Sequence, residues 1–169
     1  MSDVLLLESG YSLLLESDAT PAAPLPTFKA AVYAYVSGDP VASAQVSQLE
    51  ILRASEESRY PALTYRVATR TQPVILDGPA QHDEVDLEIK IRGCQPSSGS
   101  NGASVLVDDI AIRVRSLFNG KWSWDMAGLP VMASWVDDDT DDYDTADDAS
   151  DEGSYIQTVN VFIRHRLSV

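Results

Sequence analysis

The most regular pattern in the chain is Glu84-Val85-Asp86-Leu87-Glu88-Ile89-Lys90-Ile91-Arg92, in which charged and apolar side chains alternate at every position. Successive side chains of a β-strand point to opposite faces of a sheet, so this stretch has one apolar and one charged face. Such strands are typical of an antiparallel sheet with one face on the core and one in water. Strands of a doubly wound parallel sheet have continuous apolar runs instead.

Further segments with strand character complete the predicted sheet. The second of them places Leu63, Tyr65 and Val67 on one face, and the last alternates apolar with polar side chains up to the end of the chain. The four segments are Leu49–Leu52, Pro61–Arg70, Leu129–Val136 and Tyr155–Arg166.

Two segments have the periodicity of amphipathic helices. Phe28–Val36 repeats apolar residues at spacings of four and three before Gly38 and Pro40, and Ala103–Phe118 carries a longer apolar stripe and ends before Gly120. A short helix over 41–48 is an open alternative to loop. The sequence therefore predicts an α+β fold, an antiparallel sheet of four to five strands packed by two main helices. The apolar stripe consists of Leu106, Ile110, Val114 and Leu117.

The first 27 residues form a separate part of the chain. Leu5-Leu6-Leu7-Glu8-Ser9 is repeated as Leu13-Leu14-Leu15-Glu16-Ser17 with Gly10 between, which predicts a β-hairpin arm over 1–17. Residues 18–27 hold three prolines and three alanines, typical of an extended linker to a main domain over 28–169. An isolated hairpin is marginal in water, so its leucines need a partner. We expect a neighbouring subunit, with the chain's own sheet as the alternative.

Charge is concentrated in one stretch. The chain has 26 acidic and 12 basic residues, a net charge of −14, and residues 137–152 hold ten of the acids with no base. No Lys/Arg cluster offers the footprint of a nucleic-acid site, so specific nucleic-acid binding is not expected. We predict a solvated acidic loop over 137–152 that faces a channel or a partner. Its candidate residues are Asp137, Asp138, Asp139, Asp141, Asp142, Asp144, Asp147 and Asp148.

A calcium loop is the alternative for this stretch. Asp137, Asp139 and Asp141 fit the first ligand positions of an EF-hand, but Asp142 stands where that loop needs glycine and Asp148 where it needs glutamate. The solvated loop is therefore the preferred interpretation.

The sequence contains few residues or motifs that indicate catalysis or cofactor binding. Cys94 is the single cysteine, so no internal disulfide or cysteine zinc site is expected, and no phosphate loop or nucleophile motif occurs. His82-Asp83-Glu84 lies at the start of a regular strand and is interpreted as ordinary strand-edge polarity rather than a base with its orienting acid. The N-terminus lacks a signal peptide and no apolar run reaches a membrane span, so we expect a cytoplasmic product without a cofactor.

Two short motifs are candidates for subunit contact. Trp122 and Trp124 are expected to share one side of an extended segment, either capping the core or packing on another subunit. Arg164 and Arg166 flank His165 near the C-terminus, either as a solvated strand end or as partners for a neighbour's acidic run.

The order of several motifs resembles the tail terminator, or tail-completion, proteins of long-tailed bacteriophages. They are Tyr60-Pro61-Ala62-Leu63-Thr64-Tyr65, Leu76-Asp77-Gly78 before the alternating strand, the helix 105–117, an Asp-rich segment with Tyr143, and a last strand over 153–164. The resemblance covers about residues 28–169. Residues 1–27 lie outside it, and the acidic run is longer than in the family and lacks its arginine.

This resemblance implies a non-enzymatic virion protein of the tail or neck, assembled in the host cytoplasm. It implies a ring, typically a hexamer, that ends the tail tube, presents the tail to the head connector and lets DNA pass through. The implied partners are the tail tube protein and the head–tail connector protein. Two alternatives remain open: another neck or head-closure ring subunit, and a small metal-dependent enzyme using the aspartates.

Overall fold

The computed structural model of the chain describes residues 5–6, 12–13, 26–51, 60–73, 81–94, 102–144 and 154–167. It confirms the predicted α+β class, with three helices and a main sheet that is mostly antiparallel. No helix in these ranges is both long and apolar enough to span a membrane. The elements are β1 (Leu5–Leu6), β2 (Ser12–Leu13), α1 (Phe28–Ser37), α2 (Pro40–Gln45), β3 (Gln48–Ile51), β4 (Ala62–Thr71), β5 (His82–Cys94), α3 (Gly102–Phe118), β6 (Lys121–Met126), β7 (Leu129–Asp144) and β8 (Ser154–Arg166).

The main sheet has six strands in the order β3-β4-β5-β8-β7-β6. All neighbours are antiparallel except β3, which runs parallel to β4. The prediction of four to five strands missed β6, a short strand that pairs with β7 through a tight turn. β1 and β2 form a separate two-stranded antiparallel sheet with Leu5 opposite Leu13, as the predicted hairpin requires. The rest of the predicted arm and most of the linker lie outside the described residues.

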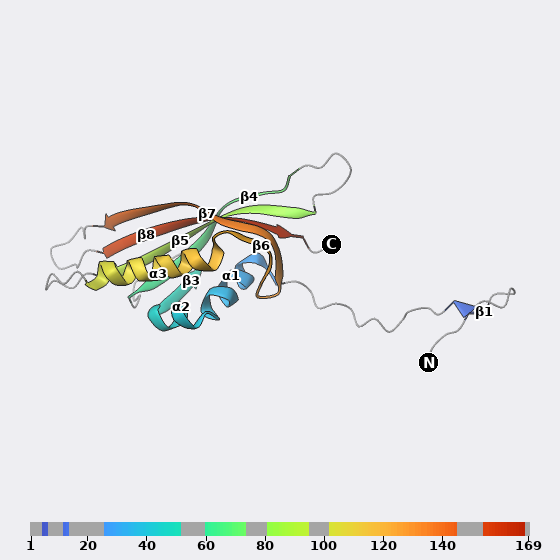
Figure 1. Ribbon diagram of the computed structural model, residues 1–169, viewed down its shortest axis with the longest axis horizontal. Helices are drawn as coiled ribbons and strands as arrows, with labels where there is room; N and C mark the ends of the chain where they lie inside the picture. The colour runs from blue at the N-terminus through green and yellow to red at the C-terminus, as the bar shows by residue number, and fades with distance from the viewer. Residues whose placement is uncertain are drawn as a thin grey trace.

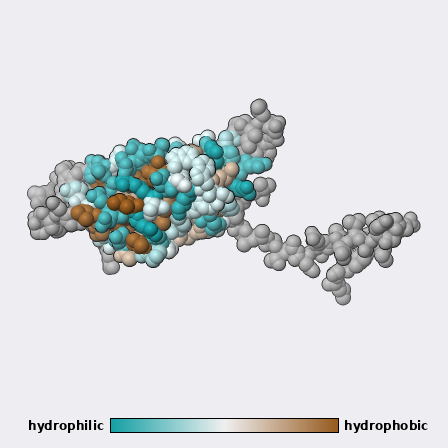
Figure 2. Space-filling model, viewed as in Figure 1, coloured by the Kyte–Doolittle hydropathy of each residue, from teal (hydrophilic) through white to brown (hydrophobic). Residues whose placement is uncertain are grey.

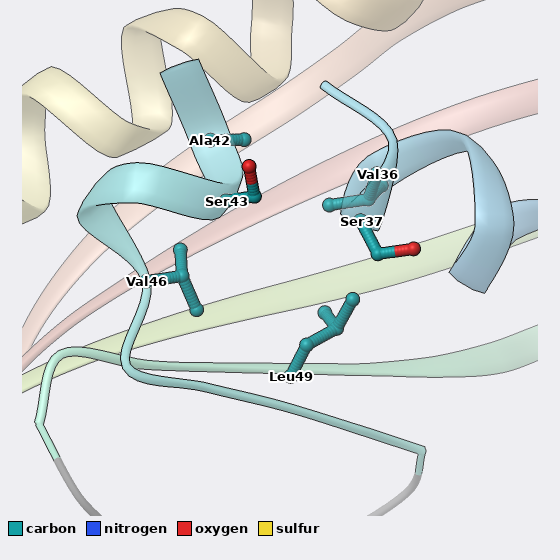
Figure 3. A pocket seen from close by; sticks show the side chains of 6 residues that line it. All are labelled: Val36, Ser37, Ala42, Ser43, Val46 and Leu49. Carbon is teal, nitrogen blue, oxygen red and sulfur yellow. The ribbon is translucent and has the colours of Figure 1, made fainter. Parts of the chain in front are cut away.

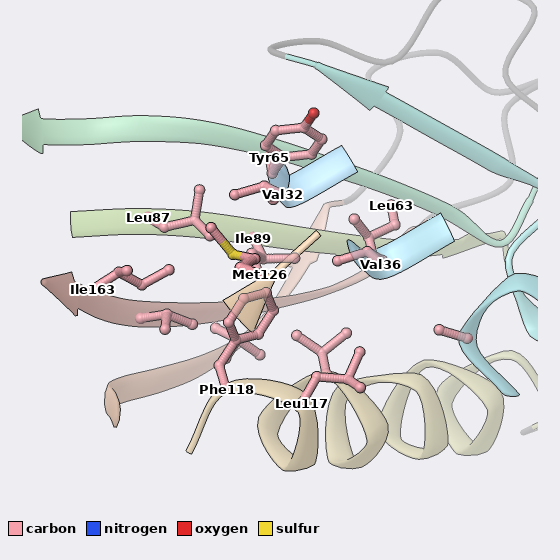
Figure 4. Packing of buried hydrophobic residues seen from close by; sticks show 14 of the residues in the cluster. Val32, Val36, Leu63, Tyr65, Leu87, Ile89, Leu117, Phe118, Met126 and Ile163 are labelled. Carbon is pink, nitrogen blue, oxygen red and sulfur yellow. The ribbon is translucent and has the colours of Figure 1, made fainter. Parts of the chain in front are cut away.

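The three helices cover one face of the main sheet (Figure 1). Side chains from α1 and α3 point onto the apolar residues of the central strands and form one continuous core (Figure 4). The alternation that defined β5 holds in the structure, since its four apolar side chains are buried against the helices. Four buried residues that mark this core are Val32, Ile89, Val114 and Ile163.

Helix α1 is fixed to the core by its cap and by two tyrosines. Thr27 caps the helix, since its hydroxyl accepts a hydrogen bond from the Ala30 N–H. The Tyr65 hydroxyl donates to the Lys29 carbonyl at 2.9 Å, and burial raises the pKa of Tyr65 to about 12. The Tyr35 hydroxyl donates to the carbonyl of Leu117 at 3.1 Å and thereby joins α1 to the end of α3.

Asp39 joins the two other helices. Its Oδ1 accepts hydrogen bonds from the N–H groups of Val41 (3.1 Å) and Ala42 (2.8 Å), the N-cap geometry of α2. The same carboxylate receives two hydrogen bonds from Arg113 of α3. The guanidinium lowers the pKa of Asp39 more than burial raises it.

Asp39→Ala is expected to lower the free energy of unfolding at pH 7 by about 1 kcal/mol, the usual value of an N-cap. The pKa of Asp39 is lower in the folded than in the unfolded chain. The stability that its carboxylate contributes is therefore fully present above the pKa of the unfolded chain, and it is lost as the pH falls through the pKa of the folded chain. Urea unfolding of both proteins at pH 7 and pH 3 measures this. The difference in unfolding free energy between wild type and variant should be smaller at pH 3 than at pH 7. A larger difference at pH 3 would contradict a stabilising role of the Asp39 carboxylate.

Candidate interaction surface

The face of the sheet opposite the helices carries no helix or strand among the described residues (Figure 1). Its side chains come from alternate positions of β4, β5, β8 and β7, the positions between those that enter the core. We call this the uncovered face. It combines an aromatic group near β6 with a network of ion pairs over β4, β5 and β8.

Three aromatic side chains lie at one end of the uncovered face. Trp135 of β7 and Phe162 of β8 are cross-strand partners whose rings stack with centroids 4.2 Å apart and an interplanar angle of 21°. Trp122 of β6 lies opposite Ala133, and directly opposite residues share a face, so Trp122 extends the same group. Its side chain is 74% exposed, the most of the large hydrophobic residues described. Aromatic side chains exposed in this way are typical of protein contacts.

Ion pairs cross the strands beside this aromatic group. Arg66 donates to both carboxylate oxygens of Glu88 at 2.8 Å, and the Lys90 Nζ lies 3.4 Å from Glu88 Oε1. The hydrogen bonds from Arg66 are the main reason that the pKa of Glu88 is lowered. Arg164, a predicted contact residue, instead donates two hydrogen bonds to Glu84 of its own chain, at 3.0 and 2.6 Å. Its charge is therefore mostly engaged within the subunit.

The two predicted tryptophans do not share one side of β6. Trp124 lies opposite Val131, which is buried in the core, and its ring packs 4.9 Å from the Tyr35 ring and 6.4 Å from the Phe118 ring. The change of face between Trp122 and Trp124 occurs at Ser123, whose φ of +48° interrupts the regular alternation. Trp124 thus caps the core, and Trp122 alone reaches the uncovered face.

The acidic run is a strand and not the predicted loop, as far as the structure describes it. Residues 137–144 continue β7 and, after a register shift at Asp137, pair with β8 from Asp138 opposite Asn160 to Asp144 opposite Ser154. Asp139 forms an ion pair with Arg115 of α3. An extended strand sends its aspartates to both faces and does not wrap around an ion, so the geometry does not support an EF-hand. Asp147 and Asp148 lie outside the described residues.

A buried polar cluster lies at the β6 end of the sheet, since His165 is also opposite Val131, the partner of Trp124, and the cluster is covered by the start of α1. Asp83 is fully buried, so the prediction of strand-edge polarity is wrong for it. His165 is 3% exposed, so the solvated strand end, one of the two alternatives for residues 164–166, does not hold at His165. They are cross-strand partners, with His165 Nε2 3.8 Å from Asp83 Oδ2. Arg70 of β4 also binds Asp83, and the Phe28 ring stacks on His165 at 5.2 Å. The contacts of this cluster join β4, β5, β8 and α1.

Among the described residues, hollows also lie outside this cluster, and two of them have a defined lining. One, of about 100 Å³, lies between α1, α2 and β3 and is lined mostly by small apolar side chains (Figure 3). The other, of about 450 Å³, is open and lies at the end of β6 and β7, where Arg166 lines it together with Ser123 and Asp125. Figure 2 shows that apolar patches on the helix side are small and separated by hydrophilic surface. Within the described ranges, no group of three or more His, Cys, Asp or Glu residues is arranged to hold a metal ion.

Trp122 and Arg166 therefore remain candidates for contact, whereas Trp124 and Arg164 are engaged within the subunit. Alternation alone identified the uncovered face, but not which tryptophan belongs to it. The side chains of the predicted leucine contacts lie outside the described set. Comparisons with known protein families and with curated proteins find no match for this chain.

Proposed function

We propose that this protein is a non-enzymatic structural subunit of a bacteriophage virion, which forms a ring that ends the tail tube and joins the tail to the head connector. The observation that best supports the proposal is the uncovered sheet face with its exposed Trp122 and its stacked Trp135–Phe162 pair. A sheet face with an exposed aromatic group is suited to contact another protein over a broad area. The motif order of residues 60–164 adds the resemblance to tail terminators.

The proposal assigns the uncovered face to the tail tube protein and the margins of the sheet to neighbouring subunits. In this arrangement the aromatic group supplies the desolvated centre of the contact, and the ion pairs around Glu84 and Glu88 form its polar rim. DNA passes through the ring without a specific protein contact, in keeping with the net charge of −14.

Trp122→Ser is expected to weaken binding to the tail tube protein at least tenfold and to leave the stability of the subunit within about 0.5 kcal/mol, because the indole is exposed in the free subunit. Analytical ultracentrifugation with purified tail tube protein measures the first quantity, and urea unfolding the second. Tyr33→Ser, at a tyrosine 45% exposed on α1, is the matched control and should bind like the wild type.

Electron microscopy and native mass measurement test the assembly itself. The expected result is a species of several subunits, seen as a ring on the ends of tail tubes. A ring found only on the portal side would favour the neck or head-closure alternative. A protein that stays monomeric with and without tail tube protein would contradict the proposal.

A further inference from the structure

Besides the short outer strands β3 and β6, parts of β4 and β7 have no partner strand on their outer side among the described residues. These parts of β4 and β7 carry opposite charges. β6 pairs only with Leu129–Ser134 of β7, so residues 135–144 of β7 pair with β8 alone among the described strands. β3 pairs only with Ala62–Tyr65 of β4, so residues 66–71 of β4 pair with β5 alone among them. The N–H and C=O groups on the outer side of such edges are templates for another strand.

The charges of these edges are fully segregated. The β7 edge has six aspartates, Asp137, Asp138, Asp139, Asp141, Asp142 and Asp144, and no base. The β4 edge has Arg66 and Arg70 and no acid. Both guanidinium groups bind carboxylates of β5, yet their side chains remain 54% and 51% exposed.

This distribution selects between possible pairings. Two β7 edges repel each other, because like charges on opposing strands are destabilising. Two β4 edges gain no attraction from charge, because each has two arginines and no acid of its own. The β7 edge of one copy and the β4 edge of another bring aspartates toward two half-exposed arginines, so the charge pattern favours a head-to-tail contact over a symmetric one.

The topology also fixes the direction of the pairing. Each strand from β4 through β5 and β8 to β7 is antiparallel to the one before, so β4 and β7 run in opposite directions within one subunit. A second copy displaced without inversion therefore presents its β4 antiparallel to the β7 of the first.

The two free edges also lie at diagonally opposite corners of the sheet. The free part of β7 lies at the end where β3 covers β4, and the free part of β4 lies at the end where β6 covers β7. Without a shift, β3 of a second copy would occupy the place of β7 of the first. A shift along the strands by about six residues, on the order of 20 Å, moves that β3 beyond Asp144 of the first copy. The same shift keeps the second copy clear of β6 of the first.

From these observations we infer that neighbouring copies of this chain join by antiparallel pairing of the β7 edge, residues 135–144, with the β4 edge, residues 66–71, of the next copy. This inference rests on the proposed function, because it names the contact through which the ring is built. The contact is heterologous, and heterologous contacts close into rings when the rotation between copies allows it.

A pair of edge-blocked variants tests this contact. The first is Asp138→Lys with Asp141→Lys, two exposed positions of the β7 edge. The second is Ala68→Glu with Gln72→Glu. Ala68 is an exposed position of the β4 edge that the β4–β5 register skips, and Gln72 is the exposed residue directly after β4. Asp108→Lys with Asp109→Lys makes the same charge change as the first variant on exposed positions of α3 and is the control.

Each edge variant alone is expected to self-associate at least tenfold more weakly than the wild type in sedimentation velocity. An equimolar mixture should recover assembly beyond a dimer, because the two unaltered edges still pair and the two altered edges carry opposite charges. The α3 control should assemble like the wild type. Melting curves of the separate variants verify that they are folded.

The possible failures are distinguishable. If the wild type assembles and the edge variants assemble equally well, or if their mixture stays monomeric, the edge contact is wrong and the ring function stands. If the wild type is monomeric even with tail tube protein, both the ring function and this contact are wrong.

Discussion

Arg70→Met is expected to lower the free energy of unfolding by about 3 kcal/mol, because it leaves the buried carboxylate of Asp83 without its main cationic partner. Oδ1 of Asp83 has no hydrogen-bond partner among the described residues. The contacts of Oδ2 must therefore offset the free-energy cost of removing this carboxylate from water. His165 Nε2, at 3.8 Å, is too distant for a hydrogen bond to Oδ2. Guanidinium chloride unfolding at pH 7 measures the loss.

A double-mutant cycle separates this mechanism from simple loss of packing. Asp83→Leu in the Arg70→Met background should recover most of the stability, since an apolar pair no longer leaves a buried charge. Arg66→Met is the matched control, because Arg66 also joins β4 to β5 but its partner Glu88 keeps Lys90 nearby and remains partly exposed. A control that loses as much stability as Arg70→Met would contradict the role given to the burial of Asp83.

This cluster also marks a limit of sequence-based prediction. The strand around it was predictable, because alternation over residues 84–92 depends only on local order. The burial of Asp83 and His165 depends on contacts with Arg70 and Phe28, which come from β4 and α1. No local pattern distinguishes a polar residue paired across strands from one in water.

The prediction of a loop for the acidic run was wrong for a different physical reason. Aspartate is depleted in strands, so a stretch with many aspartates is predicted as a loop. In the structure, residues 138–144 are held by pairing with β8, and β7 has no described neighbour on its other side there. An edge strand keeps its charged side chains solvated, and its charge discourages pairing with an identical edge. The low strand propensity of aspartate was overridden here by pairing with β8, which lies ten or more residues away in the sequence.

The positions of the tryptophans depended on one backbone angle. Regular alternation placed Trp122 and Trp124 on one side, but a φ of +48° at Ser123 lies in the left-handed region that serine seldom adopts. The sequence contains no glycine or asparagine at this position to indicate it. The candidate surface was therefore predictable as a sheet face and not as a particular set of aromatic residues.

Phe118→Ala is expected to lower the free energy of unfolding by about 3–5 kcal/mol, the range for removal of a large buried aromatic side chain. Phe118 is fully buried at the end of α3, and its ring lies edge-on to Tyr35 of α1 at 5.6 Å and to Trp124 of β6 at 6.4 Å. The cavity would therefore open where three elements meet. Chemical denaturation with near-ultraviolet circular dichroism measures both the stability and the packing of the aromatic rings.

The conservative variant Phe118→Leu tests whether ring volume at this joint is the cause. The Phe118 carbonyl accepts a hydrogen bond from Ser134 Oγ at 2.6 Å, and this backbone contact is retained in both variants. Leucine fills part of the cavity, so it should lose clearly less stability than alanine does. Because Trp124 packs on Phe118 and is two residues from Trp122, the alanine variant should also bind the tail tube protein more weakly where it is still folded. A loss below about 1 kcal/mol for Phe118→Ala would mean that α3, α1 and β6 are not held together at this residue.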